Sequence, residues 1–343
     1  MAVTLRHIAE QAGLSVSAVS QILNRRQCNF CNEERKQEVI ELAGKLGYRQ
    51  KFADKIKRGD TTRTVAILKR THHTSEIDQL VIRMLNLFEA EDCSCYVVSL
   101  PKNSDVIERA QDLIDRGVER FVLFGPVWCD DEESNCRQFQ ELIKLLVSHS
   151  CTYVSYATPS ERMVLQDFAP AVVKTVEFFR KKIGDEFKML IPLQGSNRES
   201  ALCSCFPELS VEEVRRKYIF PLEQSELSLF SSLDDIVRYG YKVTNMLLDA
   251  EPHIKGLYYM SDQLALGGIC CLKERGIEPG KDILLAGFNN FPAVRYCGYP
   301  VSTAAHDLAA LAEALVAESG STLPCRREIP PEIIIREENI SLK

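Results

Sequence analysis

The sequence lacks several features that would define whole classes of protein. No window approaches the roughly 18 consecutive apolar residues of a membrane span, and residues 1–13 lack the apolar stretch of a secretory signal. There is no Walker loop, no Gly-x-Ser-x-Gly elbow, no His-Glu-x-x-His pair and no Gly-x-Gly-x-x-Gly after the first predicted strand. We therefore expect a cytoplasmic protein that has no membrane partner, needs no cofactor and is not an enzyme.

Cysteine is not scarce, with 13 in the chain, but the features of a disulfide scaffold are lacking. The cysteines are spread over 343 residues without an export signal, and thiols in that context stay reduced. Cys28 and Cys31 have the spacing of half a zinc site, yet no matching His or Cys pair follows nearby. We therefore predict no metal site and expect most cysteines to be small buried hydrophobic residues.

Acidic residues are in the minority at one end of the chain only. Residues 1–63 hold 12 Lys and Arg against 7 Asp and Glu, a net charge of +5, whereas the remaining residues hold 30 against 41, a net charge of −11. A solvated charged face would explain a run of charge but not its confinement to one end. The asymmetry indicates a polyanionic partner for the first part alone.

Residues 1–48 contain three short helical patterns. Thr4 can cap a helix that ends at Gly13, Ser15 can cap a second one, and a third is predicted from Asn32 until Gly47. The residues expected to face a common core are Leu5, Ile8, Ala9, Ala12, Val19, Ile22, Leu23, Val39, Ile40, Ala43 and Leu46. Two helices joined by a tight Gly-containing turn are typical of a helix-turn-helix, whose second helix enters the DNA major groove.

The segments TLRHIAEQAGLSVSAVSQILN and EERKQEVIELAGKLGYR closely resemble the DNA-binding head of the LacI (lactose-repressor) family. The resemblance implies that Val16, Ser17 and Gln21 occupy the base-reading positions. It places four further residues against the DNA backbone or in support of it: Ser15, Ala18, Ser20 and Asn24. Many members carry Arg where this chain has Gln21, so we expect a preference for adenine there rather than guanine.

The resemblance also implies a hinge, residues 49–63, that folds into a helix in the minor groove and wedges a Leu from each half of a dimer into the central step. This chain departs from the family there, because Gln50-Lys51 stands where Pro-Asn is usual and the wedge position falls on Lys57. Either Ile56 takes that role by a shift in register, or the central kink is weaker. Lys57, Arg58 and their basic neighbours would still bind phosphates, unless the segment is a merely solvated linker.

From Thr64 onward, short apolar runs alternate with amphipathic stretches, which predicts parallel, doubly wound α/β sheets. The predicted strands are TVAILKR, CYVVSLP, RFVLFGP and TYVSYA and, after residue 160, KMLIPL, KYIFPL, GLYYM and ILLAGF. Helices are predicted near residues 75–91, 104–116, 135–148, 169–183, 208–217, 233–249 and 262–275. Because the alternation begins twice, we predict two lobes, with ligands bound at the carboxyl ends of the strands in a cleft between them.

The order of these elements resembles the type I periplasmic-binding-protein fold of LacI-family regulators, including GLYYMSDQLALGGICCLKERGIEPGKDILLAGFNN and the terminal PPEIIIREENI. In that fold the chain crosses between the lobes three times. The resemblance thus implies a body of residues 64–343, with a first lobe of about 64–160 and 290–320 and a second lobe of about 161–289 and 321–343. VSTAAHDL is expected in the first lobe and PPEIIIREENI in the second.

The same resemblance assigns residues to the effector cleft: His73, Thr74, Phe124, Trp128, Asp167, Arg198, Ser261 and Asn289. Arg198 offers a fork of donors to hydroxyls or a carboxylate, and Asn289 offers both a donor and an acceptor, which suits a sugar. Ser261 stands where Asn is common in the family, and Asn289-Asn290 where Asp-Asp is common. Fewer acidic acceptors would suit a ligand with more acceptors of its own, such as an acidic sugar.

Structural roles stay open for some of these residues. Asp167 is as well suited to a helix cap as to a ligand contact, and Asp262 is better interpreted as a cap. Trp128 can be a packing residue, and His72 and His73 can be solvated loop histidines.

The leading hypothesis is a repressor controlled by a small molecule, expected to be a carbohydrate. A homodimer would read a roughly palindromic operator in double-stranded DNA, and closure of the cleft would change the spacing of the two heads. A dimer is expected because a single head buries too little surface for tight specific binding. The alternatives are a solute-binding sensor with a weak or vestigial head, which the unusual hinge would explain, and a sugar-modifying enzyme.

Overall fold

The computed structural model describes residues 4–23, 31–46, 62–70, 75–101, 104–125, 132–193, 197–227, 230 and 232–337. The chain divides into two compact units, which we call the head (Met1–Thr62) and the body (Arg63–Lys343). In the part of the chain that is described, no helix is long and apolar enough to cross a membrane.

The head contains three helices, α1 (Leu5–Ala12), α2 (Val16–Leu23) and α3 (Glu33–Lys45). Thr4 caps α1 by accepting a hydrogen bond from the backbone N–H of His7, and the helix ends at Gly13 with a left-handed φ of 63°. Asn32 caps α3 by accepting from the backbone N–H of Arg35 at 2.9 Å. The predicted caps of α1 and α3 are therefore confirmed.

The three helices pack around a small apolar core of Ile8, Ala9, Ala12, Val19, Ile22, Val39 and Ala43. Arg35 joins α3 to the end of α1 by donating to the carbonyl of Ala12 at 2.6 Å, a favourable place for a cation. The prediction that Ile40 faces this core is wrong, since its side chain is 42% exposed. Ile40 follows Val39 directly and therefore points about 100° away from it around the helix.

The body contains two six-stranded sheets, one in each lobe. The first has the order β11-β5-β4-β3-β1-β2 with parallel pairing, and the second has the order β12-β10-β9-β8-β6-β7, in which β12 runs antiparallel to β10. The first sheet consists of β1 (Thr64–Arg70), β2 (Ser94–Leu100), β3 (Arg120–Phe124), β4 (Thr152–Tyr156), β5 (Arg162–Gln166) and β11 (Cys325–Ile329). The second consists of β6 (Phe187–Ile191), β7 (Ile219–Pro221), β8 (Gly256–Tyr259), β9 (Leu284–Ala286), β10 (Val301–Ala305) and β12 (Glu332–Ile334).

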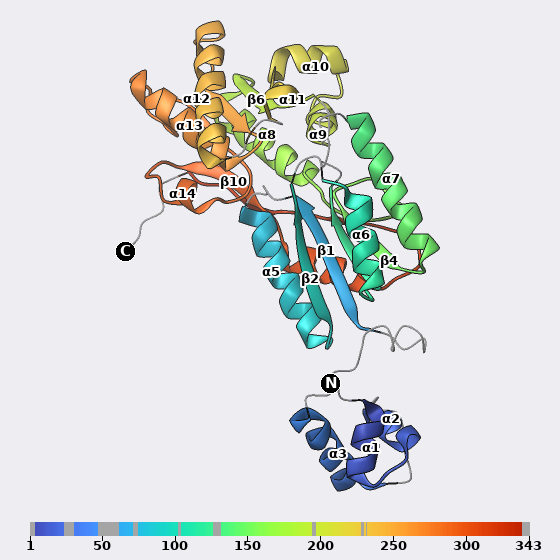
Figure 1. The fold of residues 1–343 in the computed structure, drawn as a ribbon. Coiled ribbons are helices and arrows are strands. Elements are labelled where there is room, and N and C mark those ends of the chain that lie inside the picture. Colours follow the sequence, from blue (N-terminus) through green and yellow to red (C-terminus); the bar gives the residue numbers. More distant parts are fainter. Residues whose placement is uncertain are drawn as a thin grey trace. The chain divides into compact units, whose positions relative to one another are not determined.

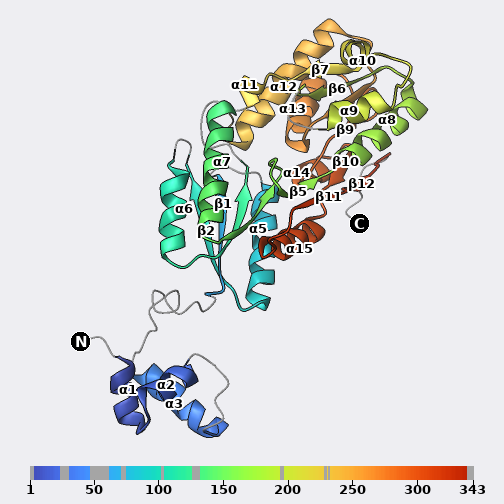
Figure 2. The same cartoon turned by 90° about the vertical axis from the view of Figure 1, so that its right-hand side faces the viewer.

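Helices cover both faces of each sheet (Figures 1 and 2). In the first lobe, α5 (Ser75–Ala90) and α15 (Leu308–Ser319) lie on one face and α6 (Val106–Asp115) and α7 (Glu132–Ser148) on the other. In the second lobe, one face carries α11 (Gln224–Leu227), α12 (Leu233–Ala250), α13 (Asp262–Glu274) and α14 (Pro292–Arg295). The opposite face carries α8 (Ala169–Ile183), α9 (Arg198–Ser204) and α10 (Val211–Tyr218).

Strand β1 shows why the apolar runs form these sheets. Val65 and Ile67 pack towards α5 and α15, whereas Ala66 and Leu68 pack towards α6 and α7. Successive side chains of a strand point to opposite faces, so a strand covered on both sides favours a continuous apolar run such as Val65–Leu68. The alternation of strands and helices predicted from the sequence is confirmed.

Helices α12 and α13 approach each other at two glycines. A Cβ atom on Gly240 would lie 2.1 Å from the carbonyl oxygen of Leu264, and one on Gly267 would lie 1.9 Å from the carbonyl oxygen of Val237. Because these neighbours are backbone atoms, no change of rotamer can make room for a side chain. The two glycines therefore allow the helices to pack backbone against backbone.

The chain crosses between the lobes at residues 167–168, 306–307 and 330–331. The predicted lobe boundaries are wrong in three places. β5 and β11 pair with each other in the first sheet, although both were expected in the second lobe. β10 pairs with β9 and β12 in the second sheet, so the strand in VSTAAHDL lies in the second lobe and the first lobe resumes only at α15. These strands have three to five residues, too few for a pattern that reveals their partner.

The expectation that most cysteines are buried is also wrong. Among the cysteines of the described ranges, all of them free, only Cys151 and Cys271 are fully buried, and the others are half-buried or exposed. Within the same ranges, no group of three or more His, Cys, Asp or Glu side chains is arranged to hold a metal ion.

Candidate DNA-recognition helix and lobe junction

The first turn of α2 is exposed. Ser15 begins the helix by accepting a hydrogen bond from the backbone N–H of Ala18 at 3.1 Å. Val16 is 45% exposed and Ser17 is also exposed, whereas Val19 and Ile22 are buried in the core of the head. The helix thus uses one face for packing and presents its start to solvent, as a helix that enters the major groove must.

Gln21 lies one turn after Ser17 and therefore on the same face of α2. Its side chain is half-buried, as are Ala18 and Ser20 beside it. Short side chains at the start of the helix and a longer amide one turn later would allow close approach to a groove and contact with a base edge. The other residues predicted to bind DNA lie outside the described residues: Asn24, Ile56, Lys57 and Arg58.

Of the residues predicted to bind the effector, His73, Thr74 and Trp128 lie outside the described residues. Phe124 ends β3 and is buried in the first lobe, where its ring centroid lies 5.4 Å from that of Tyr156. The structure thus places Phe124 in the hydrophobic core.

The side chains of Ser261 and Asp167 accept hydrogen bonds from backbone N–H groups at the starts of two helices. The hydroxyl of Ser261 caps α13 by accepting from the backbone N–H of Leu264 at 3.4 Å. The Oδ1 atom of Asp167 accepts from the backbone N–H of Ala169 at 2.9 Å, at the start of α8, and from the Asn197 amide at 2.7 Å. Both side chains have structural partners in addition to any ligand they contact.

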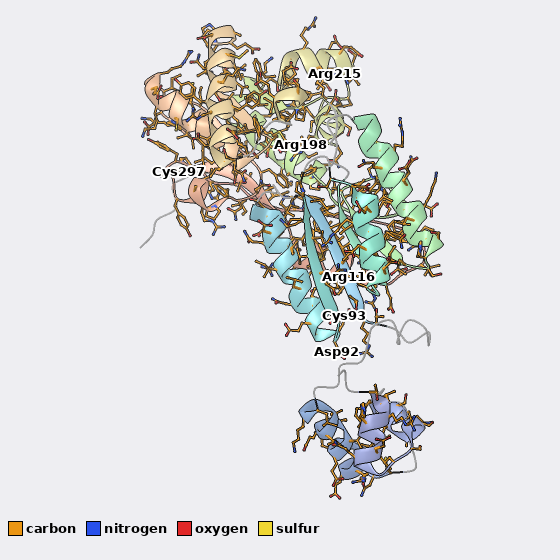
Figure 3. All side chains as sticks on the ribbon, in the orientation of Figure 1. Asp92, Cys93, Arg116, Arg198, Arg215 and Cys297 are labelled. Atoms are coloured by element: carbon orange, nitrogen blue, oxygen red, sulfur yellow. The ribbon has the colours of Figure 1, made fainter. Side chains whose placement is uncertain are left out.

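Arg198 is the first residue of α9 (Figure 3). Its buried side chain packs against two aromatic rings. Its guanidinium carbon lies 3.7 Å from the ring centroid of Phe168 and 5.3 Å from that of Phe288. Its Nε donates to the hydroxyl of Tyr258 at 3.4 Å, and a terminal nitrogen donates to the carbonyl of Met260 at 3.3 Å. These contacts fix the orientation of a cation in the second lobe.

Asn289 follows β9 with a φ of 103°, a region that Asn tolerates better than most residues. Its amide nitrogen donates to Oε1 of Gln263 at 3.2 Å, and its Oδ1 lies 3.2 Å from Nε2 of His306. Both partners are side chains of the second lobe or of the segment that leaves it. The amide of Asn289 is therefore held in place from two sides.

The contacts of Asn289 extend into a chain of side chains that joins the lobes. At one end, the Gln263 amide donates to the carboxylate of Glu76 on α5 of the first lobe at 3.5 Å. At the other end, Nδ1 of His306 lies 2.9 Å from Oε1 of Gln166, the last residue of β5. We call Glu76, Gln263, Asn289, His306 and Gln166 the junction chain.

Sequence reasoning missed every member of the junction chain except Asn289. Their position in the sequence was the one signal that could have identified them. Gln166 is the last residue of β5 and His306 directly follows β10, and the chain crosses between the lobes at both places. Since β5 was not predicted and β10 was expected in the wrong lobe, that signal could not be used.

Asp262 is the first residue of α13, but the prediction that it caps a helix is wrong because Ser261 fills that position. The buried carboxylate accepts from the backbone N–H of Phe291 at 2.7 Å and from the hydroxyl of Thr303 at 2.9 Å. Burial raises the pKa of Asp262 to about 7. Asp262 thus ties α13 to the segment after β9 that carries Asn289.

Comparisons with known proteins cover both units. A family model described as a periplasmic binding protein-like domain matches residues 199–337. The HTH-type transcriptional repressor PurR of Mannheimia succiniciproducens is 21% identical over 345 residues, with 97% of this chain and 98% of that protein covered. A structure of the lac repressor dimer bound to operator and the anti-inducer ONPF matches with a TM-score of 0.75 at 15% identity, over 99% of this chain and 100% of that one. The transcriptional regulator CelR in complex with cellobiose matches with a TM-score of 0.62 at 14% identity, over 98% of this chain and 100% of that one.

The fold and the site define a protein with a helix-turn-helix head and a two-lobed, periplasmic-binding-protein-like body. The resemblance to the LacI family of regulators, indicated by the head and body motifs, is confirmed by these comparisons. The relatives named above are transcriptional regulators rather than enzymes.

Proposed function

We propose that this protein is a sequence-specific DNA-binding transcription regulator, a repressor whose operator affinity is controlled by a small molecule bound between the lobes of the body. The observation that carries the proposal is the exposed first turn of α2, on a head that has its own core and belongs to the basic end of the chain. The similarity to PurR, a repressor, supports it. Such a regulator is not an enzyme and acts in the cytoplasm, where the DNA is.

In this proposal, two heads of a homodimer bind a palindromic operator, each reading bases through Val16, Ser17 and Gln21. Seven residues would contact the DNA backbone or support such contacts: Ser15, Ala18, Ser20, Asn24, Ile56, Lys57 and Arg58. The last three belong to the hinge, residues 49–63, between a helix-turn-helix of residues 1–48 and the body. The net charge of +5 on residues 1–63 provides the electrostatic part of the affinity, which should fall steeply as salt rises.

The small molecule is proposed to be a carbohydrate or a derivative of one, in line with the cellobiose bound by CelR. Arg198 and Asn289 are the side chains proposed to orient it, because each is rigidly held and carries hydrogen-bonding groups. Five further residues complete the proposed set, His73, Thr74, Trp128, Asp167 and Ser261, whereas Phe124 is left out because its ring is buried in the core of the first lobe.

The first test is selection of bound sequences from a random duplex library. A palindrome with adenine-rich half-sites is expected, and replacement of Gln21 by alanine should then weaken binding to that operator by about 10- to 100-fold and relax the adenine preference, since a good amide–adenine pair is worth about 1–3 kcal/mol. Fluorescence anisotropy with labelled operator and scrambled duplex measures both effects.

The control for this substitution is Gln37→Ala. Gln37 is an exposed glutamine on α3 whose amide contacts Glu41, and its replacement should change operator affinity by less than about twofold. Absence of any enriched sequence would contradict the proposed function and favour a sensor with a vestigial head. Equal losses for the two variants would contradict the assigned role of Gln21.

A further inference from the structure

His306 occupies the crossover between β10 and α15, where it contacts both lobes. Its Nε2 faces Asn289, after β9 of the second lobe, and its Nδ1 faces Gln166, at the end of β5 of the first lobe. The half-buried ring packs edge-on against Phe288, with 5.0 Å between centroids, and lies 6.5 Å from Phe168. Any change in the relative orientation of the lobes must alter these contacts.

Both atoms that face the imidazole nitrogens are amide oxygens. The Gln166 amide nitrogen donates to the carbonyls of Ile329 and Asp167, and the Asn289 amide nitrogen donates to Gln263, so neither amide can turn without losing a hydrogen bond. A neutral imidazole has one N–H and donates to only one of the two oxygens, whereas an imidazolium donates to both. Hydrogen bonding at the junction therefore favours the charged ring.

Burial and charge act in the opposite direction. Desolvation of the ring and the nearby guanidinium of Arg198 together lower the pKa of His306 to about 4. The other ionisable groups around the junction are Asp167 beside Gln166, Asp307 at the start of α15, Glu76 at the end of the junction chain, and Asp262 next to Gln263. Of all these groups, Arg198 is the one whose charge contributes to the lowered pKa of the ring.

We propose that His306 makes the arrangement of the two lobes dependent on pH: the neutral ring stabilises the arrangement described here, and a proton on the ring favours one in which the ring meets water. In the second arrangement the junction chain is interrupted at His306, so Asn289 loses one of its two fixed partners. Through this contact, acidification of the cytoplasm would weaken any ligand bound by Asn289. The proposed pH dependence arises from residues of the body and does not require DNA binding.

The size of the effect follows from proton linkage. With a pKa of about 4 in the closed junction and the ordinary value near 6.5 for a hydrated ring, the ratio of open to closed junctions rises by about 20-fold between pH 7 and pH 5. Hydrogen exchange of the full chain, corrected for the intrinsic effect of pH, measures this ratio through the backbone amides of residues 166–169, 305–308, 329 and 332.

The decisive variant is His306→Gln, which keeps a donor and an acceptor on the side chain but does not titrate. Protection at the three crossovers should fall about 20-fold on acidification in the unmodified protein and change by less than about threefold in His306→Gln. The matched control is His149→Gln, at the exposed end of α7, which should behave like the unmodified protein.

A second measurement needs no substitution. A histidine-selective NMR titration of the full chain should give one imidazole, absent from the spectrum of His306→Gln, with a pKa at least about one unit below 6.5. A His306 pKa at or above 6.5, or equal loss of protection in His306→Gln and in the unmodified protein, would overturn the proposal. Either result would leave the proposed DNA-binding function unaffected, because neither measurement involves operator or effector.

Discussion

Replacement of Gly267 by alanine is expected to lower the free energy of unfolding of the body by roughly 3 kcal/mol or more. The added methyl group would lie 1.9 Å from the carbonyl oxygen of Val237 and 2.5 Å from the backbone nitrogen of Tyr241. Relief requires α13 to move away from α12, which loosens the apolar contacts of Leu264, Val243 and their neighbours in the core of the second lobe.

Urea denaturation at a fixed protein concentration, followed by circular dichroism, measures this loss. The control is Gly44→Ala in α3 of the head, another glycine within a helix but with no atom within 4 Å of the added Cβ. That change should stabilise the head by roughly 0.5–1 kcal/mol, because alanine has the higher helix propensity. If the free energy of unfolding of Gly267→Ala lies within about 0.5 kcal/mol of that of the unmodified protein, the two helices can separate without cost.

Replacement of Asp262 by asparagine is expected to change how the free energy of unfolding of the body depends on pH. The pKa of Asp262 is about 7 in the folded protein, above its value of 3.8 when exposed, so the folded state holds this proton more tightly than the unfolded state does. Its contribution to stability is full below pH 3.8 and is lost as pH rises towards 7. Relative to Asp262→Asn, the unmodified body should therefore lose up to roughly 4 kcal/mol between pH 4 and pH 8.

The measurement is the difference in free energy of unfolding between the two proteins across that range. Taking the difference removes the titration of His306, which is common to both and acts with the opposite sign as pH falls below 6.5. Asp249→Asn, on the exposed side of α12, serves as the control for removal of one acidic side chain. A flat profile for Asp262→Asn would mean that Phe291 and Thr303 hold the carboxylate charged in spite of its burial.

Local features of this chain could be predicted because local physics determines them. Thr4 and Asn32 cap helices wherever their side chains reach a free backbone N–H, and Gly13 ends α1 because it accepts a left-handed conformation. The apolar run at Val65–Leu68 indicated a strand covered on both faces, which is what β1 became.

Features that depend on distant parts of the chain could not be predicted in this way. β5 and β11 lie more than 150 residues apart and become neighbours only because both complete the first sheet. The junction chain depends on the same long-range pairing, since it brings Gln166 within 2.9 Å of His306 from 140 residues away. The hydrogen-bond partner of a polar residue after a short strand cannot be predicted from the local sequence pattern.

The pairing of β5 with β11 also has a consequence for synthesis of the protein. The first lobe begins at β1 but receives its last strand only when residues 325–329 are available, by which time the whole second sheet except β12 has already left the ribosome or is leaving it. Domains usually fold in the order in which they emerge. Here the lobe made first must wait, with an open edge at β5, until residues 325–329 have been synthesised.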